Sequence, residues 1–552
     1  MKRSKKFMAL LLALVLVFSL AACGSQGGET PTGGGTDTPS GGGDTPATAT
    51  KTEFVYALGG SPNYLDPAIA SDSIGSYVLN QIYLPLFILG DGGAVLNAAC
   101  KDYTVDEDGL VYTFTLNDTY WSDGQKVTAE DFVYGVKHAL AFGSVDAQYL
   151  TFVTDFVAGS PELDGAKIAD MDGLGVVALD DSTLQITLYQ PCEYFLSLLC
   201  SGVYFPLRSD VAPEGDYTWA DDPNAPTNGY FHPTSIDRAD RVVMDRNTYN
   251  ESDKVSLERL TARVMEDMDA EIMAFRTGEI DYATSVEAPV AVSMFGGTDS
   301  LDIYDSTINY YVQFNSVMAP NPVLADVNVR RAFMLAINRE ELVEALDAGD
   351  AYYPLYGFVP NGLSSPTEGD FRDAGGDYCG YDPDAAKELL KDYPDGVTIE
   401  YYYNQNNMHD TVASVMKRQL AEVGITLDLK TADVRVFFDD RDTQGNYEAA
   451  RGAMSADYMD SMTYLAMGLS TWQAGYTWGD ATYDQMIAEA NTFTGQERLT
   501  KLHEAEKYLV ETQGYVCPLF GYKTVCLKNP NSTGYINNPQ GNSFFYFVSF
   551  NG

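Results

Sequence analysis

The side chains that most often carry out chemistry are present in this chain, but not in the patterns of common enzyme classes. The four histidines are widely scattered. The paired acids Asp221–Asp222 and Asp439–Asp440 are adjacent in sequence, which alone cannot make either pair an opposed acid and base. The chain contains no HExxH, no G-x-S-x-G, no S-x-x-K followed by K-T-G and no Walker A sequence. We therefore expect neither an enzyme nor a cofactor or metal site; a secreted hydrolase is the weaker alternative.

Seven cysteines are present, and six of them follow Cys23. No CxxC pair occurs, so neither a zinc ribbon nor a thioredoxin-type redox site is indicated. An exported chain could oxidise these six thiols, but the sequence does not choose among their pairings. Cys517 and Cys526 bracket a segment that could be a hairpin or one bent strand.

Residues 1–22 have the parts of a secretory signal peptide. Four basic residues precede an apolar run from Phe7 to Leu20, and small residues follow that run. The sixteen residues from Phe7 to Ala22 fall short of the roughly 20 that a membrane-spanning helix needs. Cys23 directly after Leu-Ala-Ala resembles the lipobox of bacterial lipoproteins, in which the cysteine is diacylated and becomes the new N-terminus. The alternative is an ordinary cleaved signal followed by a chance cysteine.

The next residues, 23–51, predict a flexible tether. They are mainly Gly, Ser, Thr, Pro and Ala, with almost no apolar surface to bury. A Gly-rich coil of this length has a mean reach of about 30 Å, and two acyl chains anchor a protein stably where one does not. We therefore expect a soluble globule held by Cys23 on the extracytoplasmic face of the cell membrane.

The rest of the chain, about 500 residues, is too long for a single hydrophobic core and predicts two or three lobes. The whole chain carries 34 basic and 78 acidic residues, a net charge of −44. This charge argues against nucleic acid or anionic lipid as a ligand and favours a well-solvated surface. We expect a monomer.

Strand and helix patterns alternate along the chain, which predicts an α/β fold. Apolar residues alternate with polar ones over 111–116 and again over 184–188, as in half-buried strands. Thr128 and Asp131 form a capping pattern before a helical apolar stripe. Further helices are expected after Asp326 and over 339–348, 409–423 and 496–511, the first of these three ending at Gly349.

Several short motifs occur in the order found in one family. They are Leu65–Pro67, Tyr112–Phe114, Trp121–Gly124, Thr128–Val133, Thr227–Tyr230, Arg246–Tyr249, Arg276–Asp281, Asp326–Ala332 and Arg451–Tyr458. Together they resemble the solute-binding lipoproteins of bacterial oligopeptide and dipeptide ABC importers, the extracellular solute-binding proteins of family 5. Each motif is weak alone, but the likeness is collinear from about residue 54 to the C-terminus.

This resemblance implies an α/β fold of the periplasmic-binding-protein type (type II, cluster C), a three-lobed clamp that closes on a hinge. Lobe I would comprise 52–83, 208–307 and 525–552, lobe II 84–207, and lobe III 308–524. The expected partners are short peptides and the permease subunits of an ABC importer, with membrane attachment through Cys23.

The resemblance also implies a site for the two charged ends of a peptide. Asp457 stands where the family places the aspartate that holds the peptide's α-amino group. Arg451 and His409 stand where members that bind tri- or tetrapeptides keep carboxylate partners, and Arg441 falls on another basic family position. The six residues from Arg451 to Asp457 span at most about 20 Å, and an extended tetrapeptide spans about 13 Å, so an arginine side chain can fill the difference.

Other positions would complete this site. The backbone of Ala453, Met454 and Ser455 would pair with an extended peptide as in strand addition, which reads no side chains. Ser73 would lie near the opposing backbone segment. Tyr149 and Tyr522 are candidate aromatic residues of the pockets, among 38 tyrosines.

Two departures from the family pattern leave the ligand open. Well-described members carry tryptophans at the positions of Val434 and Met454, and a cysteine at Ser455, so their disulfide cannot form here. An oligosaccharide or another non-peptide solute is the main alternative ligand, because Trp472, Trp478 and the tyrosines could stack on sugar rings. A nickel chelate would call for more histidines than the four present.

Overall fold

The computed structural model describes residues 51–551 except 71, 143–150, 160–172, 251, 285, 317–320, 366–368 and 471–478. The signal peptide, Cys23 and most of the tether lie outside the described residues, as do Tyr149, Trp472 and Trp478. Among the described residues, no helix combines the length and the apolar character that crossing a bilayer requires.

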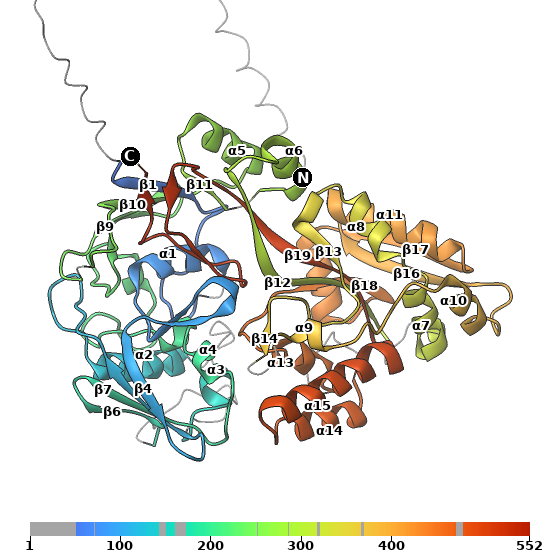
Figure 1. Cartoon of the computed structure of the whole chain (residues 1–552), viewed down its shortest axis with the longest axis horizontal. Coiled ribbons are helices and arrows are strands. Elements are labelled where there is room, and N and C mark those ends of the chain that lie inside the picture. Colours follow the sequence, from blue (N-terminus) through green and yellow to red (C-terminus); the bar gives the residue numbers. More distant parts are fainter. Residues whose placement is uncertain are drawn as a thin grey trace, which may run out of the picture. The chain divides into compact units, whose positions relative to one another are not determined.

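A large mixed sheet dominates the described chain (Figure 1). Its strands, in spatial order, are β17 (Ile425–Ala432), β16 (Val397–Asn404), β18 (Ala449–Met454), β12 (Leu301–Phe314), β19 (Val516–Lys528), β11 (Tyr282–Ala283), β1 (Glu53–Ala57), β10 (Arg259–Arg263), β9 (Arg241–Arg246) and β8 (Phe231–Asp237), with β13 (Tyr352–Pro354) also paired to β19. The two long strands β12 and β19 are antiparallel and join the strands before residue 300 to those after it. Both are rich in β-branched and aromatic residues, which favour strands.

The single strand β19 settles the question left open about Cys517 and Cys526. Both cysteines lie on this strand, which is bent by register shifts against β12. Nine residues of strand separate them by roughly 30 Å, too far for a disulfide. The six cysteines of the described chain are all free thiols.

A smaller antiparallel sheet has the order β4-β5-β7-β6. Its strands are β4 (Cys100–Val105), β5 (Val111–Leu116), β7 (Thr183–Thr187) and β6 (Val176–Asp180). The predicted strands over 111–116 and 184–188 are thus confirmed, and their apolar residues meet in the register pairs Tyr112–Ile186 and Phe114–Leu184. Two-stranded pairs complete the strands: β2 (Phe87–Leu89) with β3 (Val95–Asn97), β14 (Ser364–Ser365) with β15 (Gly369–Asp370), β20 (Ser532–Thr533) with β23 (Ser549–Phe550), and β21 (Ile536–Asn537) with β22 (Ser543–Phe544).

Most of the helices begin at side-chain caps. The α-helices are α1 (Ser73–Ile82), α2 (Ala129–Phe142), α3 (Thr151–Thr154), α4 (Phe195–Leu198), α5 (Met268–Thr277), α6 (Ala288–Phe295), α7 (Val327–Leu335), α8 (Arg339–Ala345), α9 (Phe371–Ala374), α10 (Pro383–Leu389), α11 (Asn407–Ala421), α12 (Val434–Phe438), α13 (Met462–Leu465), α14 (Ala481–Ala490) and α15 (Gly495–Lys507). The Asp326 carboxylate accepts the Asn328 N–H at 2.8 Å and starts α7 as predicted. The prediction that the next helix runs to Gly349 was wrong: α8 ends at Ala345, because Asp347 turns into the left-handed region with φ 50°.

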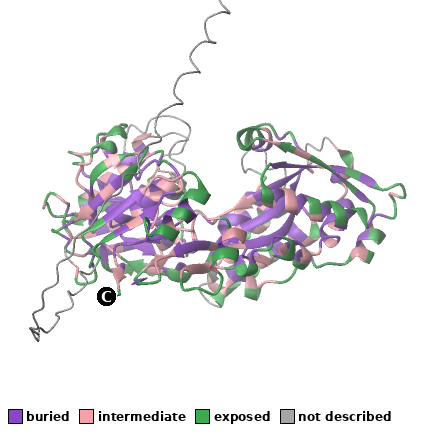
Figure 2. Ribbon diagram, turned by 90° about the horizontal axis from the view of Figure 1, so that it is seen from above, coloured by how far each residue is buried: buried purple, intermediate pink, exposed green. Residues whose placement is uncertain are grey.

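The core has two main parts. One group of buried apolar side chains draws mainly on residues 54–262, with 526 and 544–548, and a second draws mainly on residues 310–520. Figure 2 shows the sheet strands largely buried, with exposed residues on the outer faces of the helices. The predicted lobes I and II therefore share one core and the predicted lobe III has its own, while the three-lobe division stays a prediction.

Candidate functional site

A cavity of about 250 Å³ lies beside the turn that follows β18. It brings together three of the predicted site residues, Ser73, Ser455 and Asp457. The rest of the lining comes from distant parts of the chain: Pro67, Ala70, Asp72, Ser76, Leu79, Asn80, Phe152, Ser197, Cys200, Ser201, Gly202, Phe205, Ala456, Gln540 and Asn542. A hollow of about 340 Å³ over β1, β9 and β10 is less suitable, because its Arg259 and Arg263 are already paired with carboxylates.

Asp457 lies three residues beyond β18, in a turn whose backbone is held from both sides. The Ala456 N–H donates to Thr307 Oγ1 at 3.2 Å, and the Ala456 carbonyl accepts from Gln540 Nε2 at 2.9 Å. The Asp457 N–H donates to Thr463 Oγ1 at 3.1 Å. The Asp457 carboxylate faces no cation among the described residues, and burial alone raises the pKa of Asp457 to about 6. A desolvated carboxylate without a partner is a site for a positively charged group.

The charge of the cavity has one sign. Asp72 and Asp457 both line it, and its lining contains no lysine, arginine or histidine. Asp72 also caps α1, because its Oδ1 accepts the Gly75 N–H at 2.7 Å. The remaining polar groups are hydroxyls and side-chain amides, which can bind any polar ligand atom. The cavity therefore favours a ligand with a cationic end.

One edge of β18 is available to a ligand near this cavity. On one side β18 pairs with β12 along its whole length, with Tyr310 opposite Ala453. On the other side β16 pairs only with Ala449 and Ala450, so no described strand covers that edge from Arg451 to Met454. Backbone groups at an open strand edge can add an extended chain, as expected from the sequence for residues 453–455.

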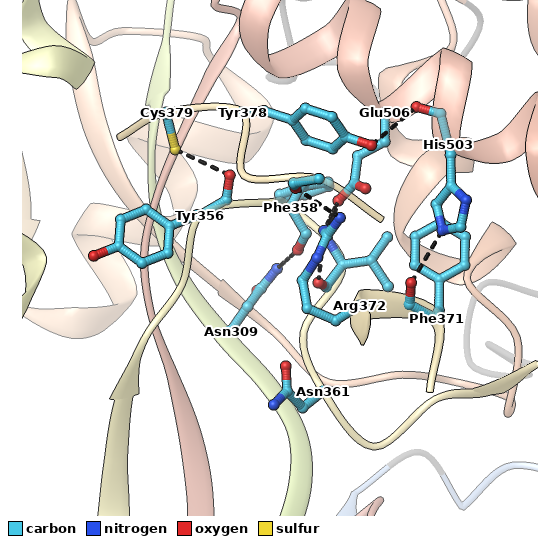
Figure 3. Close-up of polar contacts among 12 residues, drawn as sticks. Asn309, Tyr356, Phe358, Asn361, Phe371, Arg372, Tyr378, Cys379, His503 and Glu506 are labelled. Atoms are coloured by element: carbon cyan, nitrogen blue, oxygen red, sulfur yellow. Dashed lines mark hydrogen bonds and ion pairs between the residues drawn. The ribbon is translucent and has the colours of Figure 1, made fainter. Parts of the chain in front are cut away.

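The open end of β18 rests on a buried polar network. Asn309 accepts the Met454 N–H at 3.2 Å and donates to the Phe358 carbonyl at 2.7 Å (Figure 3). The next residue, Val359, donates its N–H to the buried carboxylate of Glu506 at 2.8 Å. Arg372 donates to the same carboxylate at 2.5 Å. These contacts hold in place the segment that supports β18, and a site that reads backbone groups requires such support.

Arg451 and Arg441 lie together at the other end of the segment. Arg451 is buried, donates to Asn404 Oδ1 at 2.7 Å, and lies 5.1 and 5.3 Å from the rings of Phe437 and Phe438. Arg441 donates to the Arg451 carbonyl at 2.9 Å and shares the same two rings. No carboxylate among the described residues forms an ion pair with Arg451, so its guanidinium charge is balanced only by an amide and π faces.

His409 lies in the first turn of α11, next to this arginine pair. Its Nδ1 is 3.2 Å from the Tyr310 hydroxyl, and its backbone N–H is capped by Asn406 at 2.7 Å. Burial and the neighbouring charge of Arg451 lower the pKa of His409 to about 3. His409 is therefore neutral near pH 7 and can offer only a hydrogen bond. The partly buried Tyr522 packs on the same side, with its hydroxyl 3.8 Å from Met408 Sδ.

The predicted site residues thus form two groups. Ser73, Ser455 and Asp457 line the cavity; Arg451, Arg441, His409 and Tyr522 lie outside its lining, and β18 with the residues after it connects the two groups. Ala453 and Met454 lie at the open strand edge. Sequence reasoning missed Asn404, Thr307 and Gln540, whose roles depend on tertiary contacts and leave no local pattern. Asp72 could have been noticed as a helix N-cap before α1.

Comparison with known proteins agrees with this fold. Residues 94–476 match the family model of bacterial extracellular solute-binding proteins, family 5. The chain is 28% identical over 558 residues to the dipeptide-binding protein DppE of Bacillus subtilis (strain 168), and the match covers 98% of both chains. It is 27% identical over 512 residues to the periplasmic murein peptide-binding protein MppA of Escherichia coli (strain K12), covering 89% of this chain and 92% of that one.

Solved structures show the same architecture. The unliganded open form of the murein tripeptide binding protein MppA superposes with a TM-score of 0.74 at 25% identity, covering 91% of this chain and 97% of that one. A periplasmic oligopeptide-binding protein from Borrelia burgdorferi gives a TM-score of 0.74 at 25% identity, covering 90% and 99%. The predicted α/β fold of the periplasmic-binding-protein type is therefore confirmed, and the family model spans more than half of the chain. This chain belongs to the bacterial extracellular solute-binding proteins of family 5.

Proposed function

We propose that this protein binds short peptides by their two termini and their backbone and delivers them to an ABC importer. The observation that carries the proposal is a pair of opposite charges at the two ends of one segment, Arg451 and Asp457. Arg451 is buried and Asp457 is partly buried, and neither forms an ion pair among the described residues. A free peptide carries an ammonium group at one end and a carboxylate at the other, so one ligand can neutralise both.

The energetics favour such a ligand. A buried charge without a partner is costly, and the cost is recovered when a ligand of opposite charge arrives with good geometry. The open edge of β18 lies between the two charges and can bind main-chain groups without reading side chains. Neutral His409 and paired Arg441 add polar contacts at the carboxylate end. The similar proteins are named for binding dipeptides, a murein tripeptide and oligopeptides, which agrees with this ligand class.

An oligosaccharide fits this site less well. A neutral sugar would leave both Asp457 and Arg451 without a counter-charge, and the cavity lining contains no tryptophan. Native mass spectrometry of the purified protein distinguishes the two ligands. We expect a heterogeneous set of retained peptide masses on a monomeric protein; a single saccharide mass would contradict the proposal.

Calorimetry with blocked ligands tests the two charges separately. We expect trialanine to bind, and N-acetyl-trialanine and trialanine amide each to bind at least about tenfold more weakly, because each lacks one terminal charge. Equal affinity for all three would contradict capture by the termini. The recovered peptides should be intact after long incubation, and any turnover would contradict a non-enzymatic role.

We further propose, from the sequence of residues 1–50, that the mature protein is lipidated on Cys23 and held on the extracytoplasmic face of the cell membrane. The basic, apolar and small-residue order before Cys23 supports this, as does the Gly-rich tether after it. In cells fed labelled palmitate we expect the wild type to be labelled and to co-purify with importer permease subunits. The variant Cys23→Ser should be unlabelled; equal labelling would contradict the anchor.

A further inference from the structure

The segment that follows Asp457 is packed against the residues that precede α4. The Tyr458 ring stacks on Tyr194, with centroids 4.7 Å apart and planes 9° apart, and it meets Phe152 edge-on at 5.7 Å. Phe152 lines the cavity, and so does Ser197, whose hydroxyl donates to the Tyr194 carbonyl at 2.8 Å. The stacked rings therefore form the layer directly behind the cavity wall.

Arg498 in α15 joins the same two segments by charge. Its guanidinium donates two hydrogen bonds of 2.8 Å to Asp460 and lies 3.7 Å from the Glu193 carboxylate. It also lies over the Tyr194 ring at 5.4 Å. Burial opposes the charge of Arg498, but Asp460 outweighs it and raises the pKa of Arg498 above its ordinary value. One buried cation thus serves two carboxylates from distant parts of the chain.

These contacts bear directly on Asp457. Among the described residues, no side chain forms a hydrogen bond or an ion pair with the Asp457 carboxylate, so the orientation of this carboxylate depends on the backbone that carries it. That backbone is held before Asp457 by Thr307 and Gln540. After it, the Tyr458 ring and the bidentate Asp460–Arg498 pair fix the next residues.

We propose that Tyr194 and Arg498 are positioning residues of the amine subsite, which hold the Tyr458–Asp460 segment against the residues before α4 and so keep Asp457 aimed into the cavity. Tyr194 and Glu193 belong to the predicted lobe II, and Tyr458, Asp460 and Arg498 to the predicted lobe III. The same contacts therefore couple capture of the peptide amine to contact between two lobes. This inference rests on the proposed peptide-binding function.

The physical reason is preorganisation. A carboxylate that is already fixed in a dry site binds a cation without a further ordering cost, whereas a loose turn must be ordered during binding. Contacts that join two lobes across a bound ligand must also break before the ligand leaves, so their loss appears mainly in the dissociation rate. A conformational change of this kind requires that the ligand favours the joined form.

The test is the dissociation rate of ¹³C-labelled trialanine, measured by chase with unlabelled peptide and native mass spectrometry. We expect Tyr194→Ala to release the peptide about tenfold faster, since an aromatic pair of this geometry contributes measurably beyond its buried area. Tyr194→Phe keeps the stacked ring and should release the peptide at the wild-type rate. Arg498→Lys keeps the charge but loses the planar fork, and should release peptide a few-fold faster.

Two further measurements separate a positioning role from an effect on overall stability. Tyr189→Ala is the matched control, because Tyr189 lies on the same stretch but is 53% exposed, and it should release peptide at the wild-type rate. The thermal midpoint of the ligand-free protein should fall for Tyr194→Ala but not for Tyr194→Phe, because only alanine removes the stacked ring, so release rates are compared at a temperature where every variant is folded. If the wild type binds trialanine and Tyr194→Ala releases it at the same rate as the wild type, the positioning role is overturned and the proposed function is not. If the wild type binds no peptide, the proposed function itself is overturned.

Discussion

The two ends of the segment from Arg451 to Asp457 present opposite charges that are held in different ways. Asp457 is placed by its backbone alone, and it is desolvated without a counter-charge among the described residues. Arg451 is placed by its own side chain, through Asn404 and two phenylalanine rings, and a second arginine and a neutral histidine lie beside it. Binding of the peptide amine therefore depends on one carboxylate, whereas binding of the peptide carboxylate is shared by Arg451, Arg441 and His409.

The largest effect should come from removing the single carboxylate. We expect Asp457→Ala to weaken trialanine binding by about 3–5 kcal/mol, or roughly a thousandfold or more in Kd, because the peptide ammonium is then buried without a partner. Isothermal titration calorimetry measures this loss. Asp395→Ala, at an exposed aspartate elsewhere in the chain, serves as the control and should bind as the wild type does.

A blocked peptide allows a double-mutant cycle, in which the protein residue and the ligand group are each removed. N-acetyl-trialanine has no ammonium group, so Asp457→Ala should cost it little or nothing beyond its already weak binding. If the variant lost equal free energy with free and acetylated peptide, Asp457 would not be the partner of the amine.

The next largest effect is expected at the end of the segment that binds the peptide carboxylate. We expect Arg451→Met to weaken trialanine binding by about 1.5–3 kcal/mol, less than Asp457→Ala, because Arg441 and His409 remain near the carboxylate. The loss should shrink when the ligand is trialanine amide. Arg435→Met on α12 removes an exposed arginine and is the matched control. A loss as large as that of Asp457→Ala would show that each end depends on a single residue, and would contradict a shared carboxylate subsite.

The two ends should also differ in their response to pH. The Asp457 pKa of about 6 means that the carboxylate loses its charge as pH falls through 6, whereas His409, with a pKa of about 3, stays neutral from pH 7 to 5. Trialanine affinity should therefore fall by about tenfold between pH 7 and pH 5 at the amine end alone. Asp457→Asn should show no such fall over this range. A pH-independent wild type would place the working pKa of Asp457 well below 5.

Much of the fold and part of the site could be predicted from local sequence. Caps and alternation located the start of α7 and the strands β5 and β7, because these depend on neighbours in the chain. The end of α8 was misplaced because Asp347 already takes a left-handed φ of 50° two residues before Gly349, whose φ of 55° is also positive. Motif order placed Ser455 and Asp457 in one cavity and Arg451 with Arg441. The stack of Tyr194 on Tyr458 could not be foreseen, since it depends on how distant segments pack.

The smallest expected effect is on the stability of the ligand-free protein, which the unpartnered Asp457 carboxylate should lower. Because burial raises the pKa of Asp457, the unfolded chain ionises near pH 4 while the native protein does so only near 6. The contribution of Asp457 to native stability should therefore fall as pH rises from about 4 to 6 and then stay constant. The shift corresponds to at most about 3 kcal/mol, reduced to about 1 kcal/mol because Asp457 is only partly buried.

Replacing the carboxylate should remove this penalty. Peptide-free Asp457→Asn should melt about 1 °C above the wild type at pH 7, with no difference below pH 4 where both side chains are neutral. Scanning calorimetry after removal of retained peptide measures the shift, and Arg451→Met provides the contrast, because an arginine keeps its charge throughout this range and its replacement should change the midpoint equally at pH 4 and pH 7. A variant that gains stability while losing its ligand is expected where a binding site stores unpaired charge. An Asp457→Asn protein less stable than the wild type at pH 7 would mean that Asp457 is already paired before any peptide binds.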